Sequence, residues 1–287
     1  MANLIKTEDW LKNFKLNIFP QPEVFRLKHP VLFFHGYGSI ASLVKPTPLH
    51  DVCLLFREHG ILSFAPNIVP YATIETRAET WKEIVLRLAE EMDIAKFNII
   101  AHSMGGLDAR YAITHLGLHE YVDSLTTLSS PHHGSSLAEF AINTPEEVKS
   151  KLASFMNWMG NQLYPEVESD TLGSVQQLTR HYLMEVFNPK TPNADDVSYY
   201  SYSAAVGKGT ETTLKPTILK YQNRHIYEEE GVNDGFVSVP SARWGEYLKS
   251  IPLSHLEQIH FNIDKDRVAV WRNFWVEAAR MLASKGH

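Results

Sequence analysis

A serine in the segment FNIIAHSMGGLDARY, residues 97–111, stands between a stretch that predicts a strand and a stretch that predicts a helix. The run at 97–101 is apolar, and an unbroken helical sequence begins at Gly105. A serine hydroxyl is a useful nucleophile only when a base can reach it, and a sharp strand-to-helix turn holds it out for that purpose. Such a turn needs small residues two positions before and after the serine, and these are Ala101 and Gly105. We therefore interpret Ser103 as a nucleophile; the alternative is an ordinary turn in which Ser103 only caps the helix.

Attack by a serine on a carbonyl carbon builds negative charge on the carbonyl oxygen, which then needs N–H donors. At a turn of this kind one donor is the backbone N–H of the residue after the serine, which is Met104. The second comes from the loop after an earlier strand. We expect Tyr37 in the sequence HGYG to supply it, because Gly36 and Gly38 allow that loop to approach a substrate closely.

An acid and a base should follow later in the chain, in the order serine, acid, histidine. Asp234, in the turn-rich sequence GVNDGFVSV, is the candidate acid, although Asn-Asp-Gly is also a good turn sequence. His255 and His260, in PLSHLEQIHFN, are both candidates for the base. The chemistry of the residues does not choose between them.

The elements that must position these residues alternate between strands and helices. Short apolar or β-prone runs predict strands at 31–36, 61–66, 97–101, 125–130 and 197–205. Apolar residues spaced as on one helix face predict helices over 74–92 and 268–282. Alternation of this kind favours parallel strands joined by helical crossovers, hence an α/β fold with a doubly wound sheet.

The segment 131–196 interrupts the alternation, because roughly 65 residues pass without a convincing strand, too many for one structureless loop. We interpret it as a helical cap inserted into a single domain that spans 1–287. An apolar acyl pocket or simple packing on the sheet would both explain its apolar residues. Two groups carry this interpretation: helix-spaced Val148, Leu152, Phe155, Met159, Leu163, Leu172, Val175 and Leu178, and the pocket candidates Phe140, Phe155, Met156, Trp158, Met159 and Leu163.

The composition limits the partners. A formal net charge of −6 argues against nucleic acid, which needs a basic face, but it leaves room for apolar, transient contact between the cap and a lipid surface. Cys53 is the only cysteine, so an intrachain disulfide and a cysteine-based metal site are both excluded. The first 20 residues lack the pattern of a signal peptide, and we expect a cytoplasmic protein.

Several motifs together resemble the triacylglycerol lipases of the bacterial true-lipase group and their fungal relatives. These motifs are NIIAHSMGGLDARY, LTTLSSPHHGSS, YYSY, NDGFVSVPSARWGEY and SHLEQIHFN, and the similarity extends over residues 31–262. The resemblance implies an α/β-hydrolase fold, hydrolysis of carboxylic esters and a lid over the acyl site. It also favours His255 as the base, because the family histidine is followed by Leu and an acidic residue, as in His255-Leu256-Glu257.

Many bacterial members of this group carry a calcium ion near the catalytic histidine. Its ligands include the acidic residue two after the histidine, matched by Glu257, and a glutamine further on, where this chain has Phe261. Because a hard cation needs several oxygen ligands, we expect no metal and no other cofactor. The expected function is hydrolysis of acylglycerol esters; short-chain esters, phospholipids, acyl transfer and a non-catalytic binding role are the alternatives.

Overall fold

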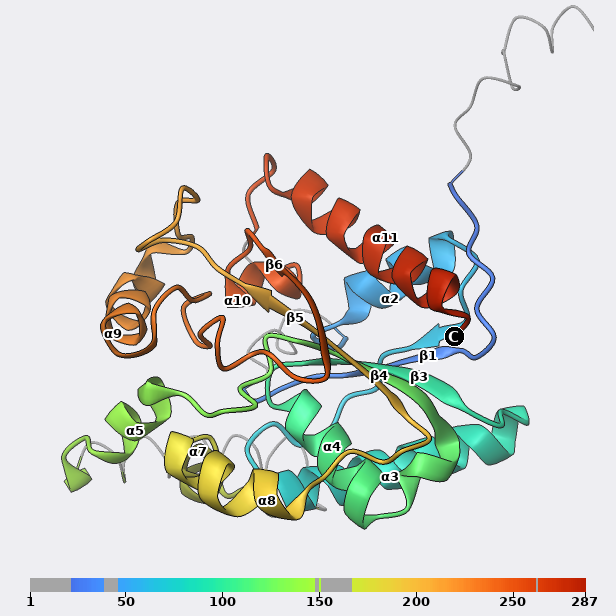
Figure 1. Cartoon of the computed structure of the whole chain (residues 1–287), viewed down its shortest axis with the longest axis horizontal. Coiled ribbons are helices and arrows are strands. Elements are labelled where there is room, and N and C mark those ends of the chain that lie inside the picture. Colours follow the sequence, from blue (N-terminus) through green and yellow to red (C-terminus); the bar gives the residue numbers. More distant parts are fainter. Residues whose placement is uncertain (1–21, 39–45, 148–149, 151–166, 262) are drawn as a thin grey trace, which may run out of the picture.

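The computed structural model describes residues 22–38, 46–147, 150, 167–261 and 263–287 (Figure 1). Six strands form one sheet in the order β2-β1-β3-β4-β5-β6, and every neighbouring pair is parallel. The strands are β1 (Val31–Phe34), β2 (Ser63–Phe64), β3 (Phe97–His102), β4 (Val122–Leu128), β5 (Ser198–Ala204) and β6 (Glu246–Ile251). The predicted α/β class and parallel sheet are confirmed.

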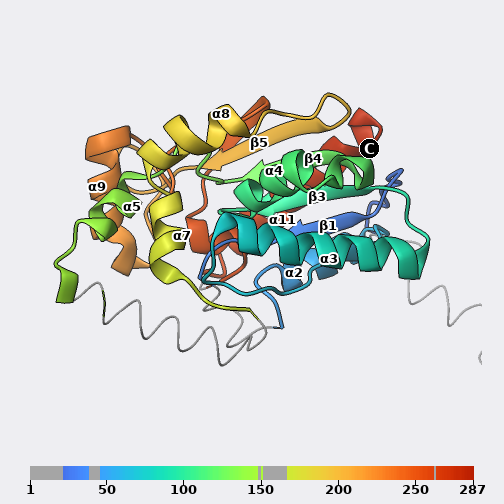
Figure 2. The same ribbon diagram turned by 90° about the horizontal axis from the view of Figure 1, so that it is seen from below.

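Helices cover both faces of this sheet (Figures 1 and 2). One face carries α2 (His50–Glu58) and α11 (Val268–Lys285), and the other carries α3 (Ile74–Met92) and α4 (Gly105–His115). Successive side chains of β1 enter opposite cores, since strand residues alternate between faces. Phe33 packs edge-on against Trp275 of α11, whereas Phe34 stacks on Trp81 of α3 with 4.0 Å between ring centres.

The regular elements described between β4 and β5 are all helical, with no strand among the described residues of this segment. Its elements are α5 (Ser136–Ile142), α7 (Thr171–Gln177), the π-helical turn η4 (Tyr182–Phe187) and α8 (Asn188–Lys190). Leu172, Val175 and Leu178 lie in or directly after α7. The predicted helix through Val148, Leu152, Phe155, Met159 and Leu163, together with Met156 and Trp158, lies outside the described residues.

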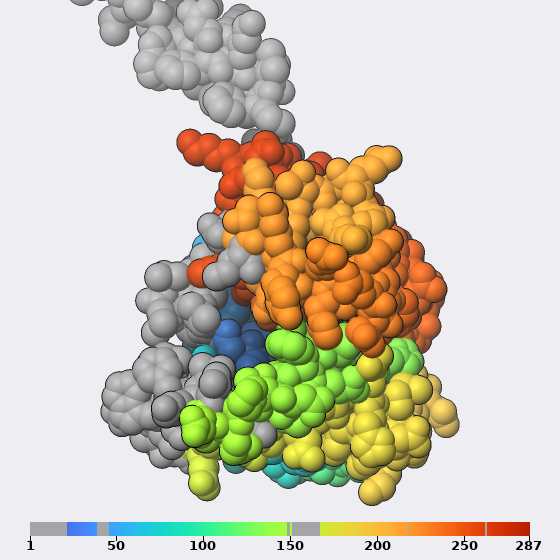
Figure 3. Space-filling model, turned by 90° about the vertical axis from the view of Figure 1, so that its left-hand side faces the viewer, coloured from blue at the N-terminus to red at the C-terminus, as the bar shows by residue number. Residues whose placement is uncertain are grey.

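The remaining described elements are η3 (Leu118–Tyr121), η5 (Thr217–Leu219), α9 (Lys220–Glu230) and α10 (His255–Gln258). Helix α9 packs beside α5 (Figure 3). There Phe140 contacts the rings of Tyr221 and His225. Within the described residues, no helix is long and apolar enough to cross a membrane.

The sequence did not predict α2, α9 or β6. Helix α9 buries only Asn223 and Ile226, so its sequence carries almost no apolar stripe. Strand β6 lies at the edge of the sheet with mostly half-exposed side chains, and therefore lacks the continuous apolar run of a central strand.

Candidate active site

The backbone turns sharply at Ser103, between the end of β3 and the start of α4. Ser103 has φ = 57°, a left-handed conformation that is strained for a residue with a side chain. Its N–H donates to the carbonyl of Leu128 at the end of the neighbouring strand, and the residue is only partly buried. Gly105 is required here, since a Cβ on it would lie 2.7 Å from the carbonyl oxygen of Phe34.

The loop after β1 lies directly against this turn. A Cβ placed on Gly36 would be 2.5 Å from the Cβ of Ser103 and 3.0 Å from the backbone nitrogen of Met104. Only glycine allows this approach. The loop that carries Tyr37 and the N–H of Met104 are therefore neighbours, as the predicted pair of oxyanion donors requires.

His35 orders this loop through its tautomer. Its Nε2 accepts the N–H of Ile68 at 3.0 Å, so the proton must be on Nδ1, which donates to the Gly36 carbonyl at 3.0 Å. Burial and the nearby charge of Arg77 lower the pKa of His35 to about 3, so the ring is neutral at pH 7. Because the C=O and N–H of one trans peptide point in opposite directions, this bond directs the N–H of Tyr37 away from His35.

Arg77 of α3, a residue that the sequence analysis missed, holds the same loop through hydrogen bonds. It donates to the carbonyls of His35 and Val69, both at 2.7 Å, and to the carboxylate of Asp108 on α4 at 2.9 Å. Arg77 and Asp108 are both fully buried. Burial raises the pKa of Asp108 to about 7, against the lowering effect of Arg77.

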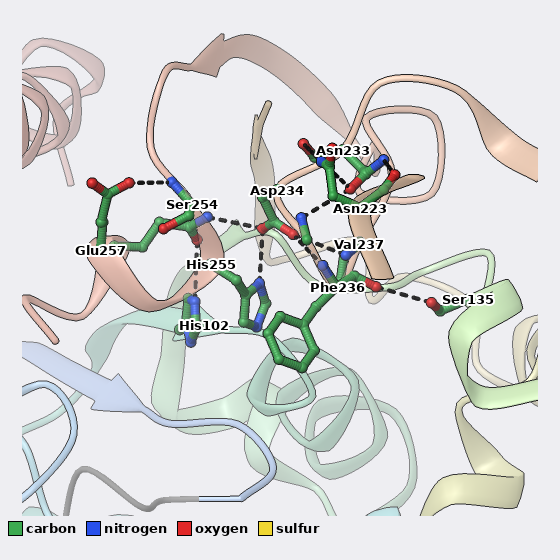
Figure 4. Close-up of polar contacts among 12 residues, drawn as sticks. His102, Ser135, Asn223, Asn233, Asp234, Phe236, Val237, Ser254, His255 and Glu257 are labelled. Carbon is green, nitrogen blue, oxygen red and sulfur yellow. Dashed lines mark hydrogen bonds and ion pairs between the residues drawn. The ribbon is translucent and has the colours of Figure 1, made fainter. Parts of the chain in front are cut away.

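Asp234 and His255 form a buried hydrogen-bonded pair (Figure 4). His255 Nδ1 donates to Asp234 Oδ2 at 2.8 Å, and the backbone N–H of His255 donates to the Asp234 carbonyl at 3.0 Å. The other carboxylate oxygen accepts the N–H groups of Phe236 and Val237 at 3.0 and 2.9 Å, so Asp234 also forms the turn that its sequence indicated. Burial alone would raise the pKa of Asp234, but the charge of His255 and these donors lower it below its usual value.

Gln258 connects this pair to the serine turn. Its amide Nε2 donates to Asp234 Oδ2 at 2.9 Å, and its Oε1 lies 3.1 Å from Nε2 of His102 (Figure 4). His102 precedes Ser103, and its ring centre lies 4.4 Å from that of His255. Burial and the charge of His255 lower the pKa of His102 well below its usual value, so its neutral ring donates to Gln258.

The two candidate histidines have different partners. The ring of His260 contacts Asp51 of α2 at 2.5 Å and stacks on Trp271. His255 is the one that contacts Asp234 and the end of β3. Gln258 lies in the same short helix as His255, but its role gave no sequence signal, since it depends on contacts with distant residues.

The residues beside His255 do not fit the calcium ion that the family resemblance implied. Glu257 is fully buried, and its Oε2 accepts the N–H of Ser254 at 2.7 Å and Nη2 of Arg267 at 3.0 Å. Its Oε1 lies 2.5 Å from Nε of Arg267. A guanidinium already balances this carboxylate, and Phe261 offers no side-chain oxygen where the glutamine ligand is expected.

Comparison with known proteins shows which proteins the chain is similar to. The family model described as the PGAP1-like alpha/beta domain matches residues 76–200. "Triacylglycerol lipase 2" of Saccharomyces cerevisiae is 35% identical over 210 residues, which cover 70% of this chain and 59% of the yeast protein. A triacylglycerol lipase of Pseudomonas fragi is 24% identical over 264 residues, 81% of this chain and 88% of that protein. The chain belongs to the lipases of the α/β-hydrolase superfamily.

Solved structures show the same fold. The mature lipase BlEst2 of Bacillus licheniformis superposes with a TM-score of 0.63 at 19% identity, covering 89% of this chain and 95% of that one. The metagenomic carboxyl esterase MGS0156 superposes with a TM-score of 0.65 at 17% identity, covering 92% and 76%. The family and the α/β-hydrolase fold expected from the motifs are thus confirmed.

Proposed function

We propose that the protein is a serine ester hydrolase that cleaves acylglycerol esters through an acyl-enzyme. One observation carries the proposal: the buried Asp234–His255 pair lies beside the end of β3, directly before Ser103, a partly buried residue with a left-handed backbone. Each role that ester hydrolysis requires has a candidate residue in this region.

In the proposed reaction Ser103 Oγ attacks the ester carbonyl carbon while His255 Nε2 accepts the hydroxyl proton. Nε2 is the nitrogen available for this step, because Nδ1 donates to Asp234. The N–H groups of Tyr37 and Met104 bind the oxyanion. His255 then returns the proton to the departing alcohol, the acyl group stays on Ser103, and a water molecule activated by His255 releases the fatty acid.

Contacts of the segment after β4 support an apolar acyl substrate. Leu183 and Phe187 of η4 form one buried apolar cluster with Met104 and Leu107, and Tyr37 packs at its edge. Side chains of the cap therefore belong to the same apolar cluster as the side chains of Met104 and Tyr37, the two proposed oxyanion residues.

A fluorophosphonate probe tests the nucleophile directly. The unmodified protein should be labelled and should hydrolyse p-nitrophenyl butyrate, whereas Ser103→Ala should lose both. Ser284→Ala, a change at an exposed serine of α11, is the matched control and should keep both. Equal activity of folded Ser103→Ala would refute the proposal.

A chain-length series tests the substrate class. Acylglycerols or p-nitrophenyl esters from acetate to palmitate should keep substantial kcat/KM beyond eight carbons. A steady fall beyond butyrate would instead identify a short-chain esterase.

A further inference from the structure

We propose that Arg267 is a positioning residue for the base: through the buried carboxylate of Glu257, its guanidinium holds the loop that carries His255, so that this loop needs no bound cation. The inference rests on the proposed function, because it assumes that His255 does chemistry. It concerns residues that touch neither the substrate nor the reacting atoms.

Arg267 contacts the beginning and the end of the loop. Its Nη2 donates to the carbonyl of Pro252, three residues before His255, and to Glu257 Oε2. Glu257 in turn accepts the N–H of Ser254, the N-cap of α10, which completes a capping box. The guanidinium of Arg267 therefore links the two ends of the segment from Pro252 to Glu257.

Helix α11 fixes the other end of α10. The indole N–H groups of Trp271 and Trp275 donate to the carbonyl of Gln258 at 3.0 and 3.1 Å, and Arg267 is the N-cap residue of this helix. Gln258 then donates to Asp234 Oδ2, the oxygen that also binds His255. Helix α11 thus positions both the loop that carries His255 and the amide of Gln258, which binds the same Asp234 oxygen as His255.

The charge of Arg267 is needed because Glu257 has no exposed surface, while only 13% of the Arg267 side chain is exposed. A buried carboxylate that loses its cation must be protonated or must move towards water, and either change disturbs the loop. Arg272 provides the contrast, because it pairs with Glu58 on the surface, where both side chains are about half exposed. Solvent screens that pair.

The guanidinium of Arg267 already lies at the carboxylate of Glu257, the position at which related lipases are expected to bind calcium. Within the ranges that the structure describes, no group of three or more carboxylate, histidine or cysteine side chains is arranged to hold a metal ion. Arg267 binds the Pro252 carbonyl and the carboxylate of Glu257 together, so it supplies both the charge and the cross-link.

Kinetics of four variants test this. Arg267→Gln should lower kcat on p-nitrophenyl butyrate by about 10- to 100-fold with KM within about twofold, since a small displacement of a catalytic group is costly. Arg267→Lys should recover part of kcat. The double variant Arg267→Gln/Glu257→Gln should have a higher kcat than Arg267→Gln alone. It leaves no unbalanced charge, and the amide oxygen introduced by Glu257→Gln can still accept the Ser254 N–H. Arg272→Gln should match the unmodified enzyme.

Addition of EDTA should leave the activity of the unmodified enzyme unchanged. Inactivation by EDTA that calcium reverses would overturn the inference, as would a double variant no better than Arg267→Gln. If Arg267→Gln fails to fold, Arg267→Lys and the double variant are compared with the unmodified enzyme. An unchanged kcat in both would also refute the positioning role of Arg267. Failure of the proposed function itself is distinguishable, since it would leave Ser103→Ala active.

Discussion

Replacing Gly36 by Ala tests whether the loop after β1 must touch the serine turn. The added methyl group would lie 2.5 Å from Ser103 Cβ, 2.9 Å from the His102 carbonyl oxygen and 3.0 Å from the Met104 nitrogen. All three atoms belong to the turn itself, so no side-chain rotation can relieve the clash. Gly36 does not have a positive φ, so the substitution adds volume without backbone strain.

The size of the effect follows from these distances. Carbon atoms in ordinary contact are about 3.5–4.0 Å apart, so the loop and the turn must separate by about 1 Å. A displacement of that size moves the Tyr37 N–H away from the oxyanion, and loss of one such donor lowers kcat by about 10²–10³-fold. Overpacking should also cost about 1–3 kcal/mol in the free energy of unfolding.

The assay is kcat for p-nitrophenyl butyrate, measured beside thermal unfolding. Gly117→Ala is the control, since Gly117 has φ = 78° and nothing within 4 Å of an added Cβ. It should lose about 1–2 kcal/mol of stability with unchanged kcat. Wild-type kcat in a folded Gly36→Ala enzyme would refute the assignment of this loop to the oxyanion site.

Two further results follow from the buried titratable groups. Asp234→Asn should lower kcat by up to about 10⁴-fold with little change in KM, because an amide cannot stabilise the charged imidazole of His255; steady-state kinetics check this, and a loss below tenfold would contradict it. The free energy of unfolding should be fully retained above pH 6.5 and should fall as the pH drops towards 3, because His35 (pKa about 3) and His102 take up protons readily only in the unfolded chain. Urea titrations at pH 7 and pH 5 should differ by up to about 2 kcal/mol for His35, with a change of the same sign from His102, and equal stabilities would exclude the effect.

Local sequence was sufficient for the strands that form the centre of the sheet and for the serine turn. Strands β1 and β3 are buried on both faces, so β1 appears as an uninterrupted apolar run and β3 as a mainly apolar one, interrupted by Asn98. The left-handed conformation at Ser103 and the small residue at position 105 lie in one short segment and could be read there, although the atoms that a Cβ on Gly105 would meet belong to Phe34 and His35, at the end of β1 and the residue after it. Helices α3 and α11 were predicted because each buries a regular apolar stripe.

Contacts between distant residues were decided only by the tertiary structure. His255 and His260 are only five residues apart in the chain, yet His255 contacts Asp234 and His260 contacts Asp51. Gln258 and Arg267 likewise give no motif, since their partners come from other loops and helices. The serine turn shows itself as small residues within one short segment. The partner of a buried polar side chain depends instead on how separate elements pack, and a single sequence does not contain that information in local form.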